Sequence, residues 1–317
     1  MEASQPPQQS NVTAYGATAV AIITLEAFAG MWINAFIVCV LCIAWVQKKT
    51  LNSNEKILLL LGCSRICLLC FSCVYNCITV IYPNYFYVYP ILQLLALLAN
   101  YFYYSNLWVS ACLCGFYCIK IANFRNSFFI YLKGKIDRMV PWLLLGSEIV
   151  ALAMGILFYD INETLLKNNI TSTCQENFWE VTIRKDKNLF SSFFLIGFGY
   201  AVSFLAVIFS AVFLLFSLWR HKRTMQTSSM KDLSMDAYIR AMKSVLSFLV
   251  MYSINFVCLL FTIIYALKNE NMMTLLITIY LYAFPGVHSL ILIFSNPKLE
   301  KALLKILPCV KCEFFIK

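Results

Sequence analysis

Few residues in this chain could do chemistry, and the most conspicuous group is a run of cysteines. Cys67, Cys70, Cys73 and Cys77 follow the spacing C-x2-C-x2-C-x3-C, which iron–sulfur proteins use to hold a cluster. On a helix, which advances about 1.5 Å per residue, these four thiols spread over about 15 Å of length and cannot converge on one cluster. We therefore expect neither a metal site nor a cofactor.

Catalytic groups are also scarce. The chain has two histidines, His221 and His288; one falls at the expected end of a helix and the other stands alone in an apolar run. An enzyme within a membrane would need convergent acids, histidines or a nucleophile with its base. We therefore expect a protein that is not an enzyme.

Three charged residues, Glu26, Arg65 and Glu148, lie within apolar runs. A charge in hydrocarbon is costly and must find partners inside a helix bundle. Glu26, Gly30 and Asn34 recur every four residues and so share one helix face, where Gly30 lets a neighbouring backbone approach. We expect one buried polar network to link the first, second and seventh helices. Its predicted members are Glu26, Asn34, Arg65, His288 and Asn296.

The elements that must position these residues are membrane helices. The chain has 317 residues, of which 61% are hydrophobic and 13% charged, and its mean hydropathy is +0.75. That composition is too apolar for a soluble globule of this size. The net charge of +10 is not gathered into one arm or one helix face, so we expect no nucleic-acid partner.

Seven apolar runs are each long enough to cross a hydrocarbon core of about 30 Å. They lie at about 17–46, 57–81, 90–119, 139–159, 189–218, 242–267 and 273–295. The fold class expected is all-α, a seven-transmembrane helix bundle in contact with lipid. Residues 1–16 form an extracellular N-terminal tail, which has no basic segment typical of a signal peptide. Residues 17–295 form the membrane domain, and 296–317 form a cytoplasmic C-terminal tail.

Lys and Arg residues mark the two sides of the membrane. The segments that this alternation places outside hold only Lys167, Arg184, Lys185, Lys187 and Lys268. Because cytoplasmic loops carry an excess of Lys and Arg, this bias predicts an outside N-terminus and an inside C-terminus. The N-x-[ST] sequons at Asn11, Asn162 and Asn169 all fall outside, where they are candidate glycosylation sites.

The third apolar run ends in an aromatic and cationic collar, as a helix does where it meets a membrane face. Its order is W-x-x-x-x-L-x-x-F-Y-x-x-K-I-A-N-F, carried by Trp108, Leu113, Phe116, Tyr117, Lys120, Ile121, Ala122, Asn123 and Phe124. This run resembles the third helix of vertebrate bitter taste receptors, the type 2 taste receptors. The seventh run resembles that family through Pro285, His288, Ser289, Leu292, Ile293, Asn296, Lys298 and Leu299.

Four further helices carry family-like residues. The first does so through Glu26, Gly30, Asn34, Phe36 and Ile37, and the second through Leu59, Ser64 and Arg65. The fifth has Ser217, Leu218, Trp219, His221 and Met225; the sixth has Arg240, Ala241, Met242, Lys243, Ser247, Phe248 and Leu249. The resemblance therefore covers most of the chain.

The resemblance implies a G-protein-coupled receptor in the plasma membrane. Such a receptor detects small amphipathic bitter compounds and activates a heterotrimeric G protein of the gustducin or inhibitory type. We expect a ligand cavity near the outer face, between helices three, five, six and seven. Its candidate residues are Ala99, Asn100, Tyr103, Asn255, Phe256, Thr278 and Tyr282. Candidate coupling residues at the inner mouth are Tyr117, Lys120, His221, Lys222, Arg240 and Lys243.

The chain also departs from the family. Ala99 and Tyr103 stand where many relatives place a ligand-contacting Trp and Asn, and Asn255 replaces an aromatic residue resembling a switch. Thr278 replaces a frequent pocket Glu, and about Ser203 the fifth-helix proline is missing. We therefore expect a divergent member with a less acidic and differently shaped pocket.

Several alternatives stay open at this stage. A vomeronasal type 1 chemoreceptor shares the outline, and a secondary transporter would show internal repeats and broken helices, which are not visible here. Cys174 has only Cys77 as a candidate disulfide partner, and Cys309 and Cys312 are either palmitoylated or unmodified. The sequence does not decide whether the chain forms homo- or hetero-oligomers.

Overall fold

Helices form the whole regular structure of the part of the chain that the computed structural model describes. The described residues are 14–81, 89–122, 127–171, 197–220, 245–261 and 271–314. Four helices lead the chain: α1 (Ala14–Lys48), α2 (Ser53–Ile81), α3 (Tyr89–Ile121) and α4 (Ser127–Thr171). Helices Gly197–Arg220 and Val245–Phe261 follow, and then α7 (Asn271–Ser295) and α8 (Pro297–Phe314).

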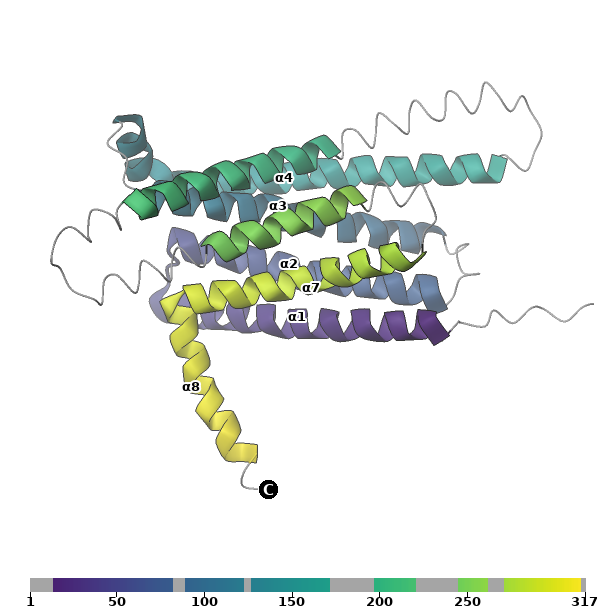
Figure 1. Cartoon of the computed structure of the whole chain (residues 1–317), viewed down its shortest axis with the longest axis horizontal. Helices are drawn as coiled ribbons and strands as arrows, with labels where there is room; N and C mark the ends of the chain where they lie inside the picture. The colour runs from purple at the N-terminus through teal and green to yellow at the C-terminus, as the bar shows by residue number, and fades with distance from the viewer. Residues whose placement is uncertain are drawn as a thin grey trace, which may run out of the picture.

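The described helices up to α7 run side by side as a bundle, and α8 leaves it at a steep angle (Figure 1). Within the described residues, α1, α2, α4, Gly197–Arg220 and α7 contain stretches long and apolar enough to cross a membrane, and Val245–Phe261 is a shorter apolar helix. The 33 residues of α3 include five tyrosines, and this helix packs on both α2 and α4. A helix with neighbours on two sides lies inside the bundle.

Local signals set the helix ends at the face that the Lys and Arg pattern places inside, here called the inner end. Lys49 adopts a positive φ of 57°, the left-handed conformation that often ends a helix. The side chain of Glu55 accepts a hydrogen bond from the backbone N–H of Asn52 at 3.0 Å, which caps α2. Pro297 is the first residue of α8, where its missing N–H costs nothing.

The helix α4 is longer than its apolar run. It begins at Ser127 rather than about 139, so residues 127–138 are helical and not an irregular connection. Ile136 and Val140 lie one turn apart, and each is only 1% exposed in an inner core cluster shared with α1, α2, α3, α7 and α8. This packing continues the helix beyond the stretch that hydropathy alone marks.

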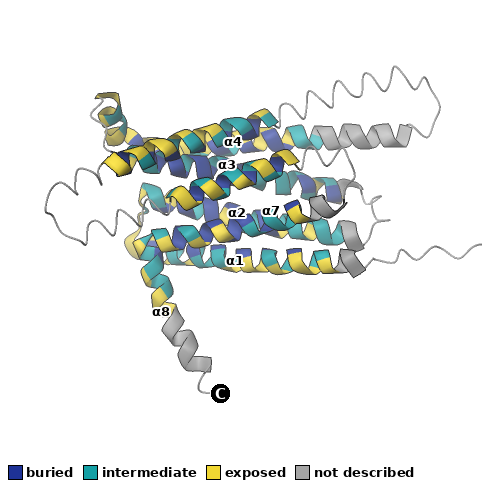
Figure 2. Ribbon diagram, viewed as in Figure 1, coloured by how far each residue is buried: buried dark blue, intermediate teal, exposed yellow. Residues whose placement is uncertain are grey.

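Figure 2 shows exposed positions along the outer faces of the helices, and many of them are large apolar residues. Trp32 is 77% exposed and Trp142 73%, as expected for surfaces that face lipid. At the crossing of α1 and α7, a Cβ added to Gly286 would lie 3.2 Å from the Cα of Gly30. The two backbones can approach this closely because both residues lack a side chain.

Candidate functional site

A cavity of about 320 Å³ opens near the outer end of the bundle. It lies among α2, α3 and α7, and Phe158 of α4 closes one side. Its lining residues are Leu68, Leu69, Ser72, Tyr75, Asn76, Ala96, Ala99, Asn100, Tyr103, Phe158, Thr278, Leu281 and Tyr282. A volume of this size matches the lower end of the range for small-molecule sites.

The cavity offers a few polar groups in an apolar wall. Asn76 of α2 donates through Nδ2 to the hydroxyl of Tyr282 on α7, so its amide is oriented by a neighbouring helix. Asn100 of α3 donates to the carbonyl of Ala96 at 2.8 Å. Such a surface suits an organic ligand held mainly by apolar contact with a small number of polar anchors.

Five of the predicted cavity residues meet here: Ala99, Asn100, Tyr103, Thr278 and Tyr282. Asn255 and Phe256 do not line this cavity, and α2 supplies wall residues that the prediction left to helices five and six. Phe256 instead stacks on Phe204 with ring centroids 4.0 Å apart. The reason is packing: this aromatic pair closes the space between their two helices.

Asn255 nevertheless lies next to a cavity residue. Its side chain is 1% exposed and neighbours the hydroxyl of Tyr103. Neither the Asn255 amide nor that hydroxyl makes a hydrogen bond of ordinary length within the described structure. Buried polar groups are nearly always satisfied, and here the amide of Asn255 and the hydroxyl of Tyr103 are placed beside each other at the edge of the cavity.

Below the cavity, Arg65 of α2 is fully buried and joins three helices. Its Nε donates to Asn106 Oδ1 on α3 at 2.8 Å. One terminal nitrogen donates to Ser289 Oγ on α7 at 2.6 Å, and the other contacts His288 Nδ1. These hydrogen bonds to neutral side chains of α3 and α7 therefore offset part of the free energy needed to bury this charge.

The network continues to α1. Ser289 Oγ donates to Asn34 Oδ1 at 2.7 Å, and Asn34 Nδ2 donates to the carbonyl of Gly30 at 2.8 Å. The structure thus brings together Asn34, Arg65 and His288, three of the five predicted members. Asn106 and Ser289 complete the group.

The two other predicted members lie elsewhere. Glu26 sits in α1, with one carboxylate oxygen buried and without a hydrogen bond in the described part of the chain. Asn296 lies at the junction of α7 and α8, where its Oδ1 accepts from the backbone N–H of Lys298 at 3.0 Å. The eight-residue separation of Glu26 and Asn34 puts both on one face, but it also places two turns of helix between them.

Glu148 of α4 has partners of its own on α3. Its two oxygens accept hydrogen bonds from Tyr101 at 2.6 Å and from Ser105 at 2.7 Å. Ser105 directly precedes Asn106, so adjacent residues of α3 contact Glu148 on one side and Arg65 on the other. A polar layer therefore crosses the bundle from α1 to α4.

The cavity and the Arg65 network are built on the same helices. On α2, Leu68 and Leu69 line the cavity one turn beyond Arg65. On α3, Tyr103 precedes Asn106 by three residues, a spacing that stacks neighbours along one face. Any rearrangement of α2, α3 or α7 around the cavity therefore acts on the contacts of Arg65.

Only part of the predicted coupling surface falls within the described residues. Lys120 of α3 pairs with Asp137 of α4 at 2.6 Å, and Tyr117 is half-buried against two core clusters. His221, Lys222, Arg240 and Lys243 lie outside the described residues. Among the described residues, Lys120 is therefore a predicted coupling residue whose ammonium forms an ion pair with α4.

The predicted modification sites are not described at the side-chain level. Asn11 and Cys174 lie outside the described residues, and Asn162, Asn169, Cys309 and Cys312 lie on helical segments whose side chains are not described. Cys77 lies 4.0 Å from Thr24 Oγ1. Glycosylation, palmitoylation and the Cys77–Cys174 pairing stay predictions.

The sequence predicted Arg65, Asn34 and His288 as members of the polar network but did not place their hydrogen-bonding partners Asn106 and Ser289 there. Ser289 stands in the H-S pair of the seventh helix and Asn106 opens the stretch of α3 that ends in K-I-A-N-F. A polar residue inside an apolar run is the signal that could have identified them. Asn76 was overlooked inside the cysteine-rich run, where it lies between Cys73 and Cys77 near the end of α2.

Together, the bundle, its outer cavity and its buried polar core define the class of seven-helix, G-protein-coupled receptors. The family model described as taste receptor protein (TAS2R) matches residues 12–311. Taste receptor type 2 member 9 of Homo sapiens is 32% identical over 299 residues, which cover 92% of this chain and 93% of the relative. The chain belongs to the taste receptor type 2 family, the bitter taste receptors.

Other relatives agree with this assignment. Taste receptor type 2 member 7 of Macaca mulatta is 30% identical over 278 residues, covering 86% of this chain and 87% of the relative. Member 114 of Mus musculus is 29% identical over 292 residues, covering 91% and 93%. The seven-transmembrane fold and the receptor class predicted from sequence are confirmed.

Proposed function

We propose that this receptor binds small amphipathic bitter compounds in the cavity among α2, α3 and α7. The observation that carries the proposal is the shared construction of the cavity and the Arg65 network on these three helices. A ligand changes a receptor's state only through different affinities for its conformations. A ligand that changes the packing of α2, α3 and α7 also changes the contacts of Arg65. Its affinity then differs between the conformation that keeps these contacts and the one that rearranges them.

The ligand chemistry follows from the wall. The carboxylates of Glu26 and Glu148 are not among the residues that line the cavity, so a neutral ligand fits better than a cation that needs a buried counter-charge. Tyr103, Asn76 and Tyr282 supply hydroxyl and amide groups. We expect ligands with an apolar body and one or two hydrogen-bonding groups, and the Asn255 amide next to Tyr103 is a candidate deeper anchor.

The direct test is to express the receptor with a promiscuous G protein and to screen bitter compounds by calcium release. Tyr103→Ala should raise the EC50 of an agonist about tenfold or more, because an aromatic anchor is removed from the cavity. Phe209→Ala is the matched control, since Phe209 is 59% exposed on the outside of the bundle. Equal EC50 values in the two variants would place the ligand elsewhere.

We further propose that the inner end couples to a heterotrimeric G protein of the gustducin or inhibitory type. Basic residues near the inner mouth support this, among them Lys120 and, outside the described residues, Lys243. Lys120→Ala combined with Lys243→Ala should abolish agonist-dependent G-protein activation while surface expression stays normal. Retained activation by the double variant would move the coupling surface to other residues. This function requires the receptor at the plasma membrane.

A further inference from the structure

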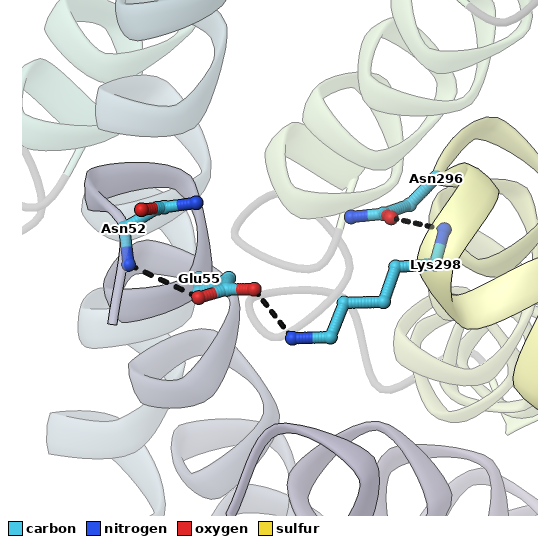
Figure 3. A network of polar contacts seen from close by, with 4 residues as sticks. All are labelled: Asn52, Glu55, Asn296 and Lys298. Carbon is cyan, nitrogen blue, oxygen red and sulfur yellow. Dashed lines mark hydrogen bonds and ion pairs between the residues drawn. The ribbon is translucent and has the colours of Figure 1, made fainter. Parts of the chain in front are cut away.

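The start of α8 is joined to the start of α2 by a compact polar contact (Figure 3). Lys298 Nζ of α8 forms an ion pair with Glu55 Oε1 of α2. The other carboxylate oxygen of Glu55 accepts from the backbone N–H of Asn52 at 3.0 Å. Asn296 Oδ1 accepts from the backbone N–H of Lys298, also at 3.0 Å. We call these four residues the inner joint.

The carboxylate of the inner joint is largely shielded from water, and its ammonium partner is partly so. The Glu55 side chain is 10% exposed and that of Lys298 34%. Leu299, the next residue along α8, is completely buried in the cluster that contains Ile57 of α2. An ion pair that is partly desolvated and held by additional hydrogen bonds resists rearrangement better than a pair on the surface.

The inner joint is the second attachment between the same two parts of the molecule. Arg65 already links α2 to His288 and Ser289 of α7. Glu55 precedes Arg65 by ten residues, which is about 15 Å of helix, and Lys298 follows His288 by ten residues across the break at Asn296. One attachment would leave α7 free to pivot against α2, whereas two attachments at different depths fix its tilt.

We propose that Glu55 and Lys298 are positioning residues for signalling, which hold α8 and the inner end of α7 in a fixed place on α2. This proposal rests on the G-protein coupling proposed above. Both oxygens of Glu55 have partners, and each end of the joint also caps its own helix. Such an arrangement is a permanent part of the coupling face, and agonists act without breaking it.

The test is a charge exchange in the full-length receptor. The variants are Glu55→Lys, Lys298→Glu and the double exchange, with Lys298→Arg as the conservative change. Lys301→Glu is the matched control, because it makes the same change of charge as Lys298→Glu at an exposed position of α8. Surface expression, agonist EC50 and maximal G-protein activation are measured for each, with the agonist found for the unaltered receptor.

Each single exchange should lower the maximal response at least about fivefold with little change in EC50, since the joint lies far from the cavity and its loss costs at least about one hydrogen-bonded ion pair. The double exchange should recover part of the response, because it restores the ion pair while a Lys at position 55 cannot accept from the backbone N–H of Asn52. Lys298→Arg and Lys301→Glu should retain most of the response. Failure of the double exchange to recover, with normal surface expression, would overturn the proposal. Increased agonist-independent signalling in the single exchanges would also overturn it, because the joint would then be a lock on the resting state.

A second readout does not depend on G-protein coupling. Hydrogen–deuterium exchange of residues 297–306, in receptor purified into lipid nanodiscs, should be about fivefold faster in the single exchanges and restored in the double exchange. If no compound activates the unaltered receptor, the proposed function fails while this result still tests the joint. Unchanged exchange in the single variants would show that the ion pair does not hold α8.

Discussion

Two groups of polar residues at opposite ends of the bundle differ in their hydrogen bonding: the Tyr103–Asn255 pair beside the outer cavity, and the inner joint. Near the outer cavity, the Tyr103 hydroxyl and the Asn255 amide are buried without a hydrogen bond of ordinary length in the described structure. At the inner end, Glu55, Asn296 and Lys298 all have partners. Unsatisfied groups cost stability but are available to a ligand, whereas satisfied groups fix geometry. This difference supports the proposals of ligand binding near the outer end and of a fixed coupling surface at the inner end.

Arg65 stands between these two regions, and its removal should have the largest effect. Arg65→Leu would leave Asn106, Ser289 and His288 without their shared partner, at a cost of about 1–3 kcal/mol for each buried group left unsatisfied. We expect loss of surface expression, or of signalling where some receptor reaches the surface, measured by antibody labelling and calcium release. Lys at this position cannot reach three acceptors in a planar arrangement, so Arg65→Lys should rescue only in part. Normal behaviour of Arg65→Leu would show that the network is dispensable.

The helix crossing of α1 and α7 should be the next most sensitive feature. Gly286→Val places side-chain atoms against the backbone of Gly30 and should lower stability by about 1–3 kcal/mol. Gly146→Val makes the same change where an added Cβ would meet nothing within 4 Å. Thermal unfolding of the detergent-solubilised variants should separate them, and equal melting temperatures would mean that α1 and α7 move apart easily.

Replacing Asn by Leu, once at each end of the bundle, tests this difference in hydrogen bonding. Asn255→Leu should raise stability by about 1–2 kcal/mol because it removes a buried amide that has no hydrogen bond of ordinary length within the described structure, while reducing sensitivity to any ligand that contacts this amide. Asn296→Leu should lower stability by about 1 kcal/mol because it removes the cap of α8. Thermal unfolding of each variant shows whether its stability rises or falls. A destabilised Asn255→Leu variant would show that the amide already has a partner, such as a bound water.

The smallest expected effect is at the Lys120–Asp137 pair. Its side chains are 45% and 51% exposed, and exposed pairs contribute about 0–1 kcal/mol. Asp137→Asn should therefore leave the melting temperature nearly unchanged. If Lys120 contacts the G protein, the same variant frees it and should preserve or raise activation. Reduced activation would indicate that Lys120 acts by orienting α4.

Hydropathy and spacing predicted the helices well because lipid selects long apolar runs, but they could not give the rotation of each helix about its axis. Asn34 and Arg65 were found because polar residues in apolar runs must meet. The part of α2 near Asn76 was overlooked as a cavity wall, since which faces border an open space depends on packing between helices. The early start of α4 was missed for the same reason, as Ile136 and Val140 are buried by contacts far away in sequence.

Arg65 also has an electrical consequence. It lies near the middle of α2 and carries a full charge at that depth. Moving a unit charge through the entire membrane field involves about 2.3 kcal/mol per 100 mV. Arg65 is held by residues on α3 and α7; as long as these contacts persist it moves only with its helices, and we expect the response to chemical stimuli to depend little on membrane voltage.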